Sequence, residues 1–452
     1  MGDSLQKRKK VLEDAEDRIS NLPDSLLCYI LSFMPTKDAG RTSVLSSRWK
    51  YLFIFSSNLE FCDSCRNIES CPSFVNFVYR VLALRGSLHV NRFRLLCDVS
   101  EDDPHVNTWI SAAVCRNAQE LEIDLCISYY NLLTTDTNLG LLPYDLFTSR
   151  TLVVLKVGVD CDLNVPSNVS LPRLKTLHLE SAFVVYDSFK RILSGCPVLE
   201  DLLIYDGCRF KHKVEVFEIS IPTLRRLTLV LRKLYSAEFY DCEVAIDAPH
   251  LQYLRYVDTV VKGYTLKELT SLAEADICIA LGDDQESGPN RLSYGLPVGK
   301  FFEAISKVVF LGLTICSVSV PEVTRCPLPT FPNLTRLKLA YNHDIGLRLL
   351  PELLCCSPNL EVLVIEHDYE DGDGSLMNLP IRPASCVSSH LKEVELKHFT
   401  GKKVELELIE YLLGGGEVLE KMTIRFSSLE CPQSKKLLAF PRCSRTCRVF
   451  LT

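Results

Sequence analysis

The sequence predicts an α/β protein in which short strands alternate with helices along a solenoid, and three short helices precede the solenoid. Three observations lead to this prediction. One apolar phrase recurs thirteen times between residues 90 and 424. Segments with the apolar spacing of helices lie between several of these phrases. Near the N-terminus, residues 21–49 combine two neighbouring apolar stripes with prolines that separate short helices.

The repeated phrase reads apolar-x-x-apolar-x-apolar, and its first anchors are about 27 residues apart, which is the spacing of leucine-rich repeats. Each repeat of that class contributes one strand plus one helix or irregular segment, and it buries its anchors only against its neighbours. The anchors are Val90/Phe93/Leu95, Ala118/Leu121/Ile123, Leu152/Leu155/Val157, Leu174/Leu177/Leu179, Leu199/Leu202/Ile204, Leu224/Leu227/Leu229, Leu251/Leu254/Tyr256, Leu272/Ala275/Ile277, Ile305/Val308/Phe310, Leu334/Leu337/Leu339, Leu360/Leu363/Ile365, Leu391/Val394/Leu396 and Leu419/Met422/Ile424.

The alternative fold is a single α/β domain with a parallel sheet. Such a domain would not repeat one short phrase so often, and 452 residues are too many for one compact core. Proline-marked turns such as FPNLTRLKL and SPNLEVLVI open several repeats. Three polar stretches, 134–144, 282–300 and 367–383, interrupt the array as inserted loops, either as plain surface loops or as loops that contact a partner.

The N-terminal segment is expected to form a helix that starts near Pro23 and ends at Pro35, followed by two short helices capped by Thr36 and Ser46. Its two stripes are Leu26/Ile30/Phe33 and Leu27/Leu31/Met34. A helix lying on one small core needs one apolar stripe, so the second indicates a covering partner. The alternative is an amphipathic helical hairpin inside a larger domain.

The run LPDSLLCYILSFMPTKDAGRTSVLSSRWKYLF closely resembles the F-box of plant F-box proteins. Gly40, where a better helix former is usual, and Phe53, where tryptophan is common, depart from the pattern. The resemblance implies docking on a Skp-type adaptor, which joins the receptor to a cullin and a RING subunit in an SCF ubiquitin ligase. By position, the implied adaptor-binding residues are Leu22, Pro23, Leu26, Leu27, Ile30, Leu31, Val44, Leu45 and Trp49.

The C-terminal segment carries a second resemblance. The run PASCVSSHLKEVELKHFTGKKVELELIEYLLGGGEVLEKMTIRF, followed by FPRCSRTCRVF, resembles the FBD region of plant F-box proteins. Val404, Leu408, Tyr411 and Leu412 predict one helix, which the three glycines 414–416 should end early. We expect this region to supply the last repeats and a cap over the end of the solenoid.

These observations divide the chain into five parts. They are a disordered basic and acidic tail (1–17), the F-box (18–55), a linking helical region (56–89), the leucine-rich repeats (90–380) and the FBD region (381–452). The fold class is therefore α/β: a leucine-rich-repeat solenoid preceded by a small three-helix F-box.

Composition and motifs argue against most other classes. The net charge of −7 does not favour nucleic acid as a partner, and no apolar run of membrane-spanning length or signal-peptide core is present. We therefore expect no membrane partner and a location in the nucleus or cytoplasm. The twenty cysteines then predict reduced thiols, and Cys62, Cys65 and Cys71 form only a weak zinc pattern. No catalytic motif is found, so we expect no enzyme activity, no metal and no cofactor.

The repeat phrase also predicts a partner-reading surface. The residue between the last two anchors should point to the inner face of the solenoid, where charged and apolar side chains alternate. These positions are Arg94, Glu122, Lys156, His178, Leu203, Thr228, Arg255, Asp276, Val309, Lys338, Val364, Glu395 and Thr423. Lys156, His178, Arg255 and Lys338 are the candidates for binding a target protein. The sequence thus predicts a substrate receptor of an SCF-type ligase, with a scaffold or a small-ligand sensor as alternatives.

Overall fold

The computed structural model describes residues 19, 21–63, 72–99, 105–127, 142–159, 163–181, 184–205, 214–231, 242–259, 261–267, 269–280, 295–315, 328–341, 347, 349–367, 379–427 and 434–452. The chain divides into two compact units, Met1–Leu171 and Pro172–Thr452. The predicted basic tail and most of the three predicted insertions lie outside the described residues.

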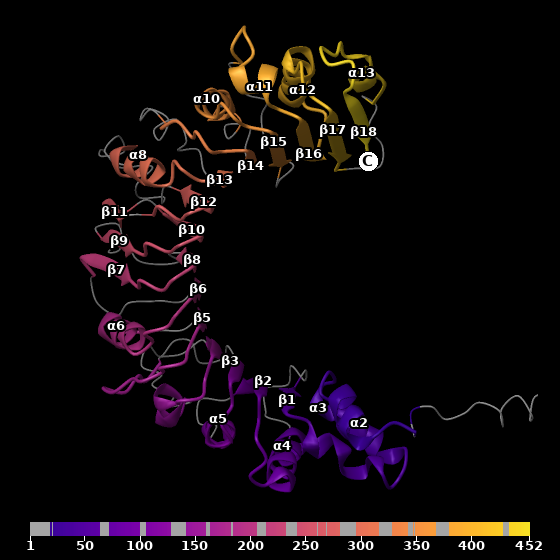
Figure 1. The fold of residues 1–452 in the computed structure, drawn as a ribbon, viewed down its shortest axis with the longest axis vertical. Helices are drawn as coiled ribbons and strands as arrows, with labels where there is room; N and C mark the ends of the chain where they lie inside the picture. Colours follow the sequence, from indigo (N-terminus) through magenta and orange to yellow (C-terminus); the bar gives the residue numbers. More distant parts are fainter. Residues whose placement is uncertain are drawn as a thin grey trace, which may run out of the picture. The chain divides into compact units, whose positions relative to one another are not determined.

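The first unit opens with short helices, as the sequence predicts (Figure 1). They are α2 (Asp24–Leu31), α3 (Thr36–Arg41) and 3-10 turns at Thr42–Val44 and Trp49–Phe55. Neither predicted cap acts as one: Thr36 is the first residue of α3, and its hydroxyl instead accepts a hydrogen bond from the backbone N–H of Glu60 at 2.8 Å. Trp49 follows an αR residue, Arg48, with no side-chain cap.

The same unit continues into a parallel sheet of β1 (Asn58–Cys62), β2 (Arg92–Val99), β3 (Glu120–Ile127) and β4 (Val154–Val159). Between the strands lie α4 (Pro72–Arg85), α5 (His105–Cys115) and a 3-10 helix at Tyr144–Thr148. The linking region at 56–89 was expected to be helical, and α4 is its helix. The strand β1 is new, since residues 56–89 were expected to be only a helical link.

The second unit is built on a longer parallel sheet. Its strands are β5 (Thr176–Glu180), β6 (Asp201–Tyr205), β8 (Arg226–Leu231), β10 (Tyr253–Thr259), β12 (Glu274–Ala280), β13 (Phe310–Ile315), β14 (Arg336–Tyr341), β15 (Val362–His367), β16 (Glu393–Phe399), β17 (Lys421–Phe426) and β18 (Arg448–Leu451). Consecutive strands pair in register, so that Leu337, Leu363, Val394 and Met422 align across four of them. This ladder is the leucine-rich-repeat fold that the periodicity predicts.

The predicted anchors form the core. Leu174, Leu199, Leu224 and Leu251 are fully buried, as are their equivalents in the other repeats. One repeat was placed in the wrong frame: Leu311 and Leu313 pair with Leu337 and Leu339, so its phrase is Val308/Leu311/Leu313 and not Ile305/Val308/Phe310. The inner-face residue of β13 is therefore Gly312 and not Val309. An ideal Cβ on Gly312 would lie 2.8 Å from Asp276 Oδ1, so glycine is what lets Asp276 lie against this strand.

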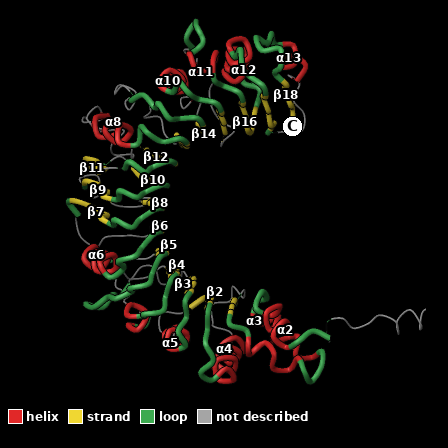
Figure 2. The backbone as a smooth tube through the Cα atoms, in the orientation of Figure 1, coloured by secondary structure: helices red, strands yellow, loops and turns green. Residues whose placement is uncertain are grey.

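The outer side of the second unit carries helices and, unexpectedly, strands (Figure 2). The helices are α6 (Tyr186–Ser194), α8 (Gly295–Ala304), α10 (Leu350–Cys356), α11 (Ser385–Ser389), α12 (Lys403–Gly415) and α13 (Ser434–Ala439). Between α6 and α8, a second parallel sheet of β7 (Val216–Ser220), β9 (Glu243–Asp247) and β11 (Gly263–Lys267) takes the place of helices.

Two local expectations need correction. Residues 282–300 were expected to be one polar loop, but α8 already begins at Gly295. The three glycines were expected to end α12 early, yet the helix includes Gly414 and Gly415, and Gly416 follows it. The reason is close packing: a Cβ on Gly415 would lie 2.6 Å from Pro383, so this helix passes its neighbour only with glycine there.

Candidate functional site

An apolar surface remains uncovered on α2 and on the turn that follows it. Leu26, Ile30 and Phe33 are 48%, 44% and 71% exposed, and Tyr29 beside them packs edge-on against Phe33 with ring centroids 4.8 Å apart. This is one of the two stripes that the sequence predicts. Further apolar side chains are exposed in and beside the unit's two 3-10 turns, at Val44, Leu45, Tyr51 and Phe55. A patch of this kind in one small helical segment is typical of a protein-binding site.

The second stripe of α2 faces inward. Leu27 and Leu31 are fully buried, and Trp49 is nearly so, beside Leu52 and Phe53. Leu27, Leu31 and Trp49 were predicted to contact an adaptor, and this stays a prediction. In the structure their side chains fill the core and hold the exposed stripe in place. Of the other six predicted contacts, Pro23, Leu26, Ile30, Val44 and Leu45 are exposed and Leu22 is half-buried. Tyr29 and Phe33 were left out of the predicted contacts, although Phe33 follows from the stripe Leu26/Ile30/Phe33.

Polar contacts fix the short helices to one another. The guanidinium of Arg48 donates from Nε to Asp24 Oδ1 at 2.7 Å and also to the carbonyl of Leu22. Ser43 Oγ donates to the carbonyl of Lys50 at 3.1 Å. The bonds of Arg48 join the start of α2 to the segment that follows α3, and the bond of Ser43 joins the two 3-10 turns of that segment.

Arg85 of α4 joins the F-box segment to the sheet. It is 3% exposed, and its guanidinium donates to the carbonyls of Ile54 and Ser56 and, at 2.8 Å, to that of His89. Burial, with the nearby charge of Arg116 as the second cause, lowers the pKa of Arg85 to about 10. The side chain is therefore still a cation at neutral pH, and it satisfies three backbone carbonyls.

The inner face, meaning the face of each unit's sheet that carries no helices, is the second candidate surface. In the first unit it carries a network in which Arg94 lies 3.0 Å from Glu60 and 3.1 Å from Glu122, and Arg92 lies 3.0 Å from Glu122. Lys156 continues this row at the position paired with Glu122. It makes no ion pair with the described residues, and its role in binding a target stays a prediction.

In the second unit the other three predicted target-binding residues lie on the inner face, in the aligned row that the sequence predicts. His178 Nε2 lies 3.7 Å from Asp201, Arg255 Nε lies 3.6 Å from Asp276, and Lys338 Nζ lies 2.8 Å from Glu366. The hydrogen bond from Lys338 lowers the pKa of Glu366. Arg255 and Lys338 are thus already engaged with carboxylates, whereas His178 Nε2 is buried without a hydrogen-bond partner among the described residues. The role of all three in binding a target stays a prediction.

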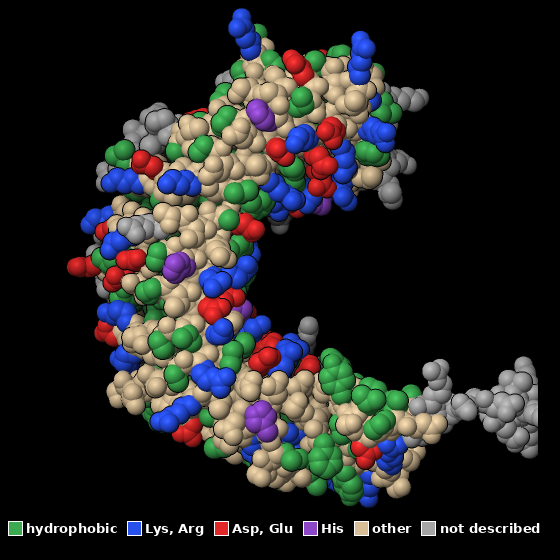
Figure 3. Space-filling view, in the orientation of Figure 1, with side chains coloured by type: hydrophobic (Ala, Val, Ile, Leu, Met, Phe, Trp, Pro, Cys, Tyr) green, Lys and Arg blue, Asp and Glu red, His purple; other side chains and the backbone are tan. Residues whose placement is uncertain are grey.

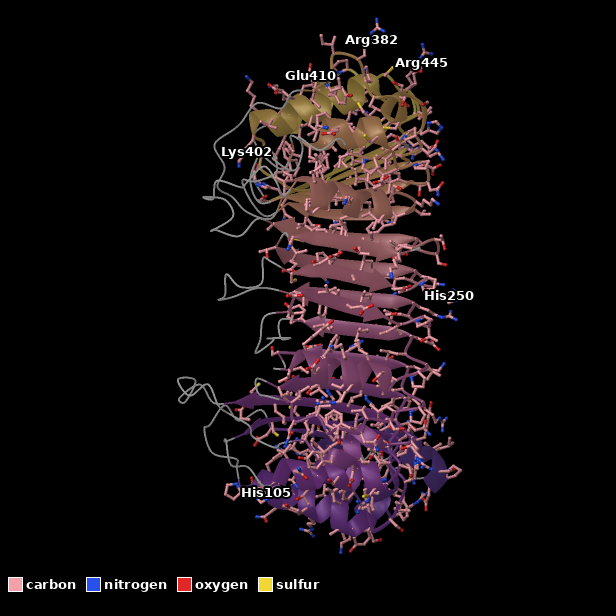
Figure 4. All side chains as sticks on the ribbon, turned by 90° about the vertical axis from the view of Figure 1, so that its left-hand side faces the viewer. His105, His250, Arg382, Lys402, Glu410 and Arg445 are labelled. Carbon is pink, nitrogen blue, oxygen red and sulfur yellow. The ribbon has the colours of Figure 1, made fainter. Side chains whose placement is uncertain are left out.

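The described residues offer little for catalysis. No group of three or more His, Cys, Asp and Glu among them is arranged to hold a metal ion, and Cys65 and Cys71 of the weak zinc pattern lie outside the described ranges. Burial raises the pKa of Cys196 to about 12 and that of Cys386 to about 11, which keeps both as thiols. In the second unit, His250 precedes β10 and Lys402 follows β16, so the two lie at opposite ends of the strands (Figure 4). No described helix combines the length and apolar character that a membrane span requires.

Comparisons with known proteins match both ends and the repeats between them. The F-box domain model matches residues 19–60, a model described as the LRR repeats of FBD-associated F-box protein At5g56370 matches 106–275, and the FBD model matches 380–424. F-box/LRR-repeat protein At3g59200 of Arabidopsis thaliana is 34% identical over 478 residues, covering 96% of this chain and 88% of that protein. F-box/LRR-repeat protein At4g14096 of the same plant is 33% identical over 440 residues, covering 92% and 89%. An exposed α2 stripe, a parallel ladder of repeats and full-length relatives lead to one conclusion: the chain belongs to the plant F-box/LRR-repeat family and carries an FBD region at its C-terminus.

Proposed function

We propose that the protein is the substrate-recognition subunit of an SCF-type ubiquitin ligase. The F-box docks on a Skp-type adaptor, which connects it to the cullin and RING subunits, and the inner face of the repeats binds a target protein. The subunit itself catalyses nothing. It raises the concentration of the target's lysines beside the ubiquitin-carrying enzyme. This function places the protein in the nucleus or the cytoplasm.

The observation that supports the proposal is the outward stripe of α2. The fold buries Leu27 and Leu31 to fill its own core but leaves Leu26, Ile30 and Phe33 in water. Fully burying one leucine or isoleucine contributes about 1.5–3 kcal/mol, so three adjacent exposed apolar side chains retain a large unused binding energy. The exposed tyrosine and phenylalanine rings add the aromatic character that is enriched in protein interfaces.

The test is a double substitution, Leu26→Glu with Ile30→Glu, in the full-length chain. Both side chains are about half exposed, so the folded chain tolerates the change, but a bound adaptor would bury two unpaired carboxylates. We expect copurification with a Skp-type adaptor to be lost. Leu84→Glu is the matched control, because Leu84 on α4 is 45% exposed in the same unit.

Adaptor recovery separates the possible outcomes. Loss of the adaptor from both the double variant and the Leu84→Glu control would reflect general damage, and circular dichroism would identify unfolding. Full recovery with the double variant would contradict the proposal. Leu27→Glu is unsuitable as the test, because a buried carboxylate at that position unfolds the segment whether or not the adaptor binds.

A further inference from the structure

The charge of the inner face changes sign along the second unit. On β5 to β12, its alternating positions carry two basic and four acidic side chains, 2 − 4 = −2: Arg226 and Arg255, against Glu180, Asp201, Glu274 and Asp276. On β14 to β18 they carry six basic and three acidic side chains, 6 − 3 = +3: Arg336, Lys338, Lys397, Lys421, Arg425 and Arg448, against Glu366, Glu393 and Glu395. Charged side chains crowd the inner side of these last strands (Figure 3).

The carboxylates of this basic surface are all engaged, whereas two of its arginines are not. Glu366 lies 2.8 Å from Lys338 and 3.8 Å from Lys397. Glu395 lies 2.8 Å from Arg425, and Glu393 lies 4.0 Å from Lys421. Among the described residues, Arg336 and Arg448 form no ion pair with a carboxylate. The guanidinium of Arg336 lies only over the ring of Phe310, 5.9 Å from its centroid.

A hollow of about 180 Å³ lies in the middle of the basic surface. Its cause is the register of the strands. Val362 and Val364 of β15 stand beside Arg336 and Lys338 of β14 on one side and beside Glu393 and Glu395 of β16 on the other. Two short apolar side chains between rows of long charged ones leave a depression with a valine floor, in which Val362 is half-buried and Val364 is 4% exposed. Arg336, Lys421 and Arg425 contribute to its walls.

We propose that the inner face of β14 to β18 binds an acidic segment of a protein partner, with an apolar side chain of that segment over Val362 and a carboxylate on Arg336. The inference rests on the proposed function only in taking the partner to be the target of the receptor. Charge complementarity supports an acidic occupant, since the excess of three positive charges lies in a chain whose net charge is −7. A bidentate pair with a carboxylate is the interaction that an arginine without an acidic partner favours.

The distribution of carboxylates favours a protein segment over a nucleic acid. Glu393, Glu395 and Glu366 lie among the basic side chains, where they would repel an evenly charged phosphate backbone. The valine floor also offers nothing to a phosphate. A peptide can place an apolar residue over Val362, acidic residues over the arginines and neutral groups over the three glutamates.

The test uses purified full-length protein and a fluorescein-labelled peptide with one leucine between two runs of four glutamates. We expect binding by fluorescence anisotropy that weakens with added salt. The double variant Arg336→Glu with Arg448→Glu should weaken binding about tenfold or more, because it replaces two attractions by repulsions. Exchanging the leucine of the peptide for glycine should weaken binding to the wild-type protein as well.

Arg226→Glu is the matched control. Arg226 also lies on the inner face and over an aromatic ring, 4.4 Å from the centroid of Tyr253, but in the acidic part of the face. Its reversal should change the affinity by no more than about twofold. Equal weakening by this control, no binding at low salt, or no effect of the double variant would overturn the proposal. The proposal would also be overturned if a single-stranded oligonucleotide of equal charge bound more tightly than the peptide and the double variant abolished that binding.

Failure of this proposal is distinguishable from failure of the proposed function. The Arg336/Arg448 variant should still copurify with the adaptor, and the Leu26/Ile30 variant should still bind the peptide. Thermal unfolding of both variants by circular dichroism reports whether the repeats stay folded.

Discussion

At the scale of single residues, the structure separates positions that look alike in the sequence. Leu26 and Leu27 are neighbours of one type, yet one faces solvent and the other fills the core. The helical period assigns them to different stripes, but it does not say which stripe faces inward, because that depends on the position of Trp49 and Phe53. Arg85 shows the same limit: as an arginine at the end of a helix it reads as a surface residue, and only the fold shows three carbonyls converging on it.

Arg85→Met is the prediction at this scale. Methionine retains an apolar side chain but donates nothing, so the buried carbonyls lose their partners. We expect the free energy of unfolding to fall by about 3 kcal/mol, measured by denaturant titration. Arg80→Met is the control, since Arg80 lies exposed on the same helix. Similar losses for the two variants would show that Arg85 does not hold the segment.

At the scale of elements, the last strand closes the array. β18 is only four residues long, and it pairs with β17, whose Met422 and Ile424 are fully buried. Backbone bonds join the two strands at both ends, from Arg448 N–H to Glu420 and from Thr452 N–H to Ile424, each 2.9 Å long. A very short edge strand has few unpaired backbone N–H and C=O groups. As the edge strand, β18 therefore favours aggregation less than β17 would.

Removal of residues 434–452 should therefore make the protein aggregate. The deletion takes away α13 and β18, uncovers the edge of β17 and removes the buried Leu437. We expect light scattering at a concentration where the full chain is monomeric, together with a lower melting temperature. Removal of residues 1–17 controls for shortening the chain. A monomeric product with unchanged melting temperature would show that this segment is no cap.

The sequence predicts elements well where one pattern dominates and poorly where two compete. The anchors of most repeats were placed correctly because no other frame fits them. At residues 305–313 two frames overlap, and only pairing with Leu337 and Leu339 decides between them. The outer strands β7, β9 and β11 were missed because only a helix or an irregular segment was expected between phrases. In the structure, Val216–Ser220 alternates exposed and buried side chains as a strand does. The need for glycine at position 415 comes from its contact with Pro383, which no local sequence pattern predicts.

At the scale of the whole molecule, one chain carries both an apolar F-box patch and the long polar inner face of the repeats. In the proposed function each surface binds its own partner, and the function lies in the covalent connection between the two surfaces. A receptor and a scaffold have the same two surfaces, and the fate of the bound partner distinguishes them.

Deletion of the F-box should make true targets accumulate, because they remain bound but lose the ligase. Charge reversal at Lys156 with Arg255, and separately at Lys338, should slow turnover of the same targets by weakening binding, and two changes are combined because one exposed charge contributes little. Pulse-chase measurement of partner half-lives, with pull-down by each variant, tests both. Equal turnover of partners with and without the F-box would favour the scaffold.

The outer sheet has a consequence for how the second unit bends. Neighbouring strands lie about 4.8 Å apart, whereas packed helices lie about 8–10 Å apart. A stack of repeats bends because its helical side is wider than its strand side. Where β7, β9 and β11 back the sheet, both sides have the same spacing, so the stack from β6 to β12 should run almost straight and resist flexing. The stack should curve only where α10, α11 and α12 back the sheet. A ligand bound there meets a concave surface, whereas the surface from β6 to β12 is nearly flat.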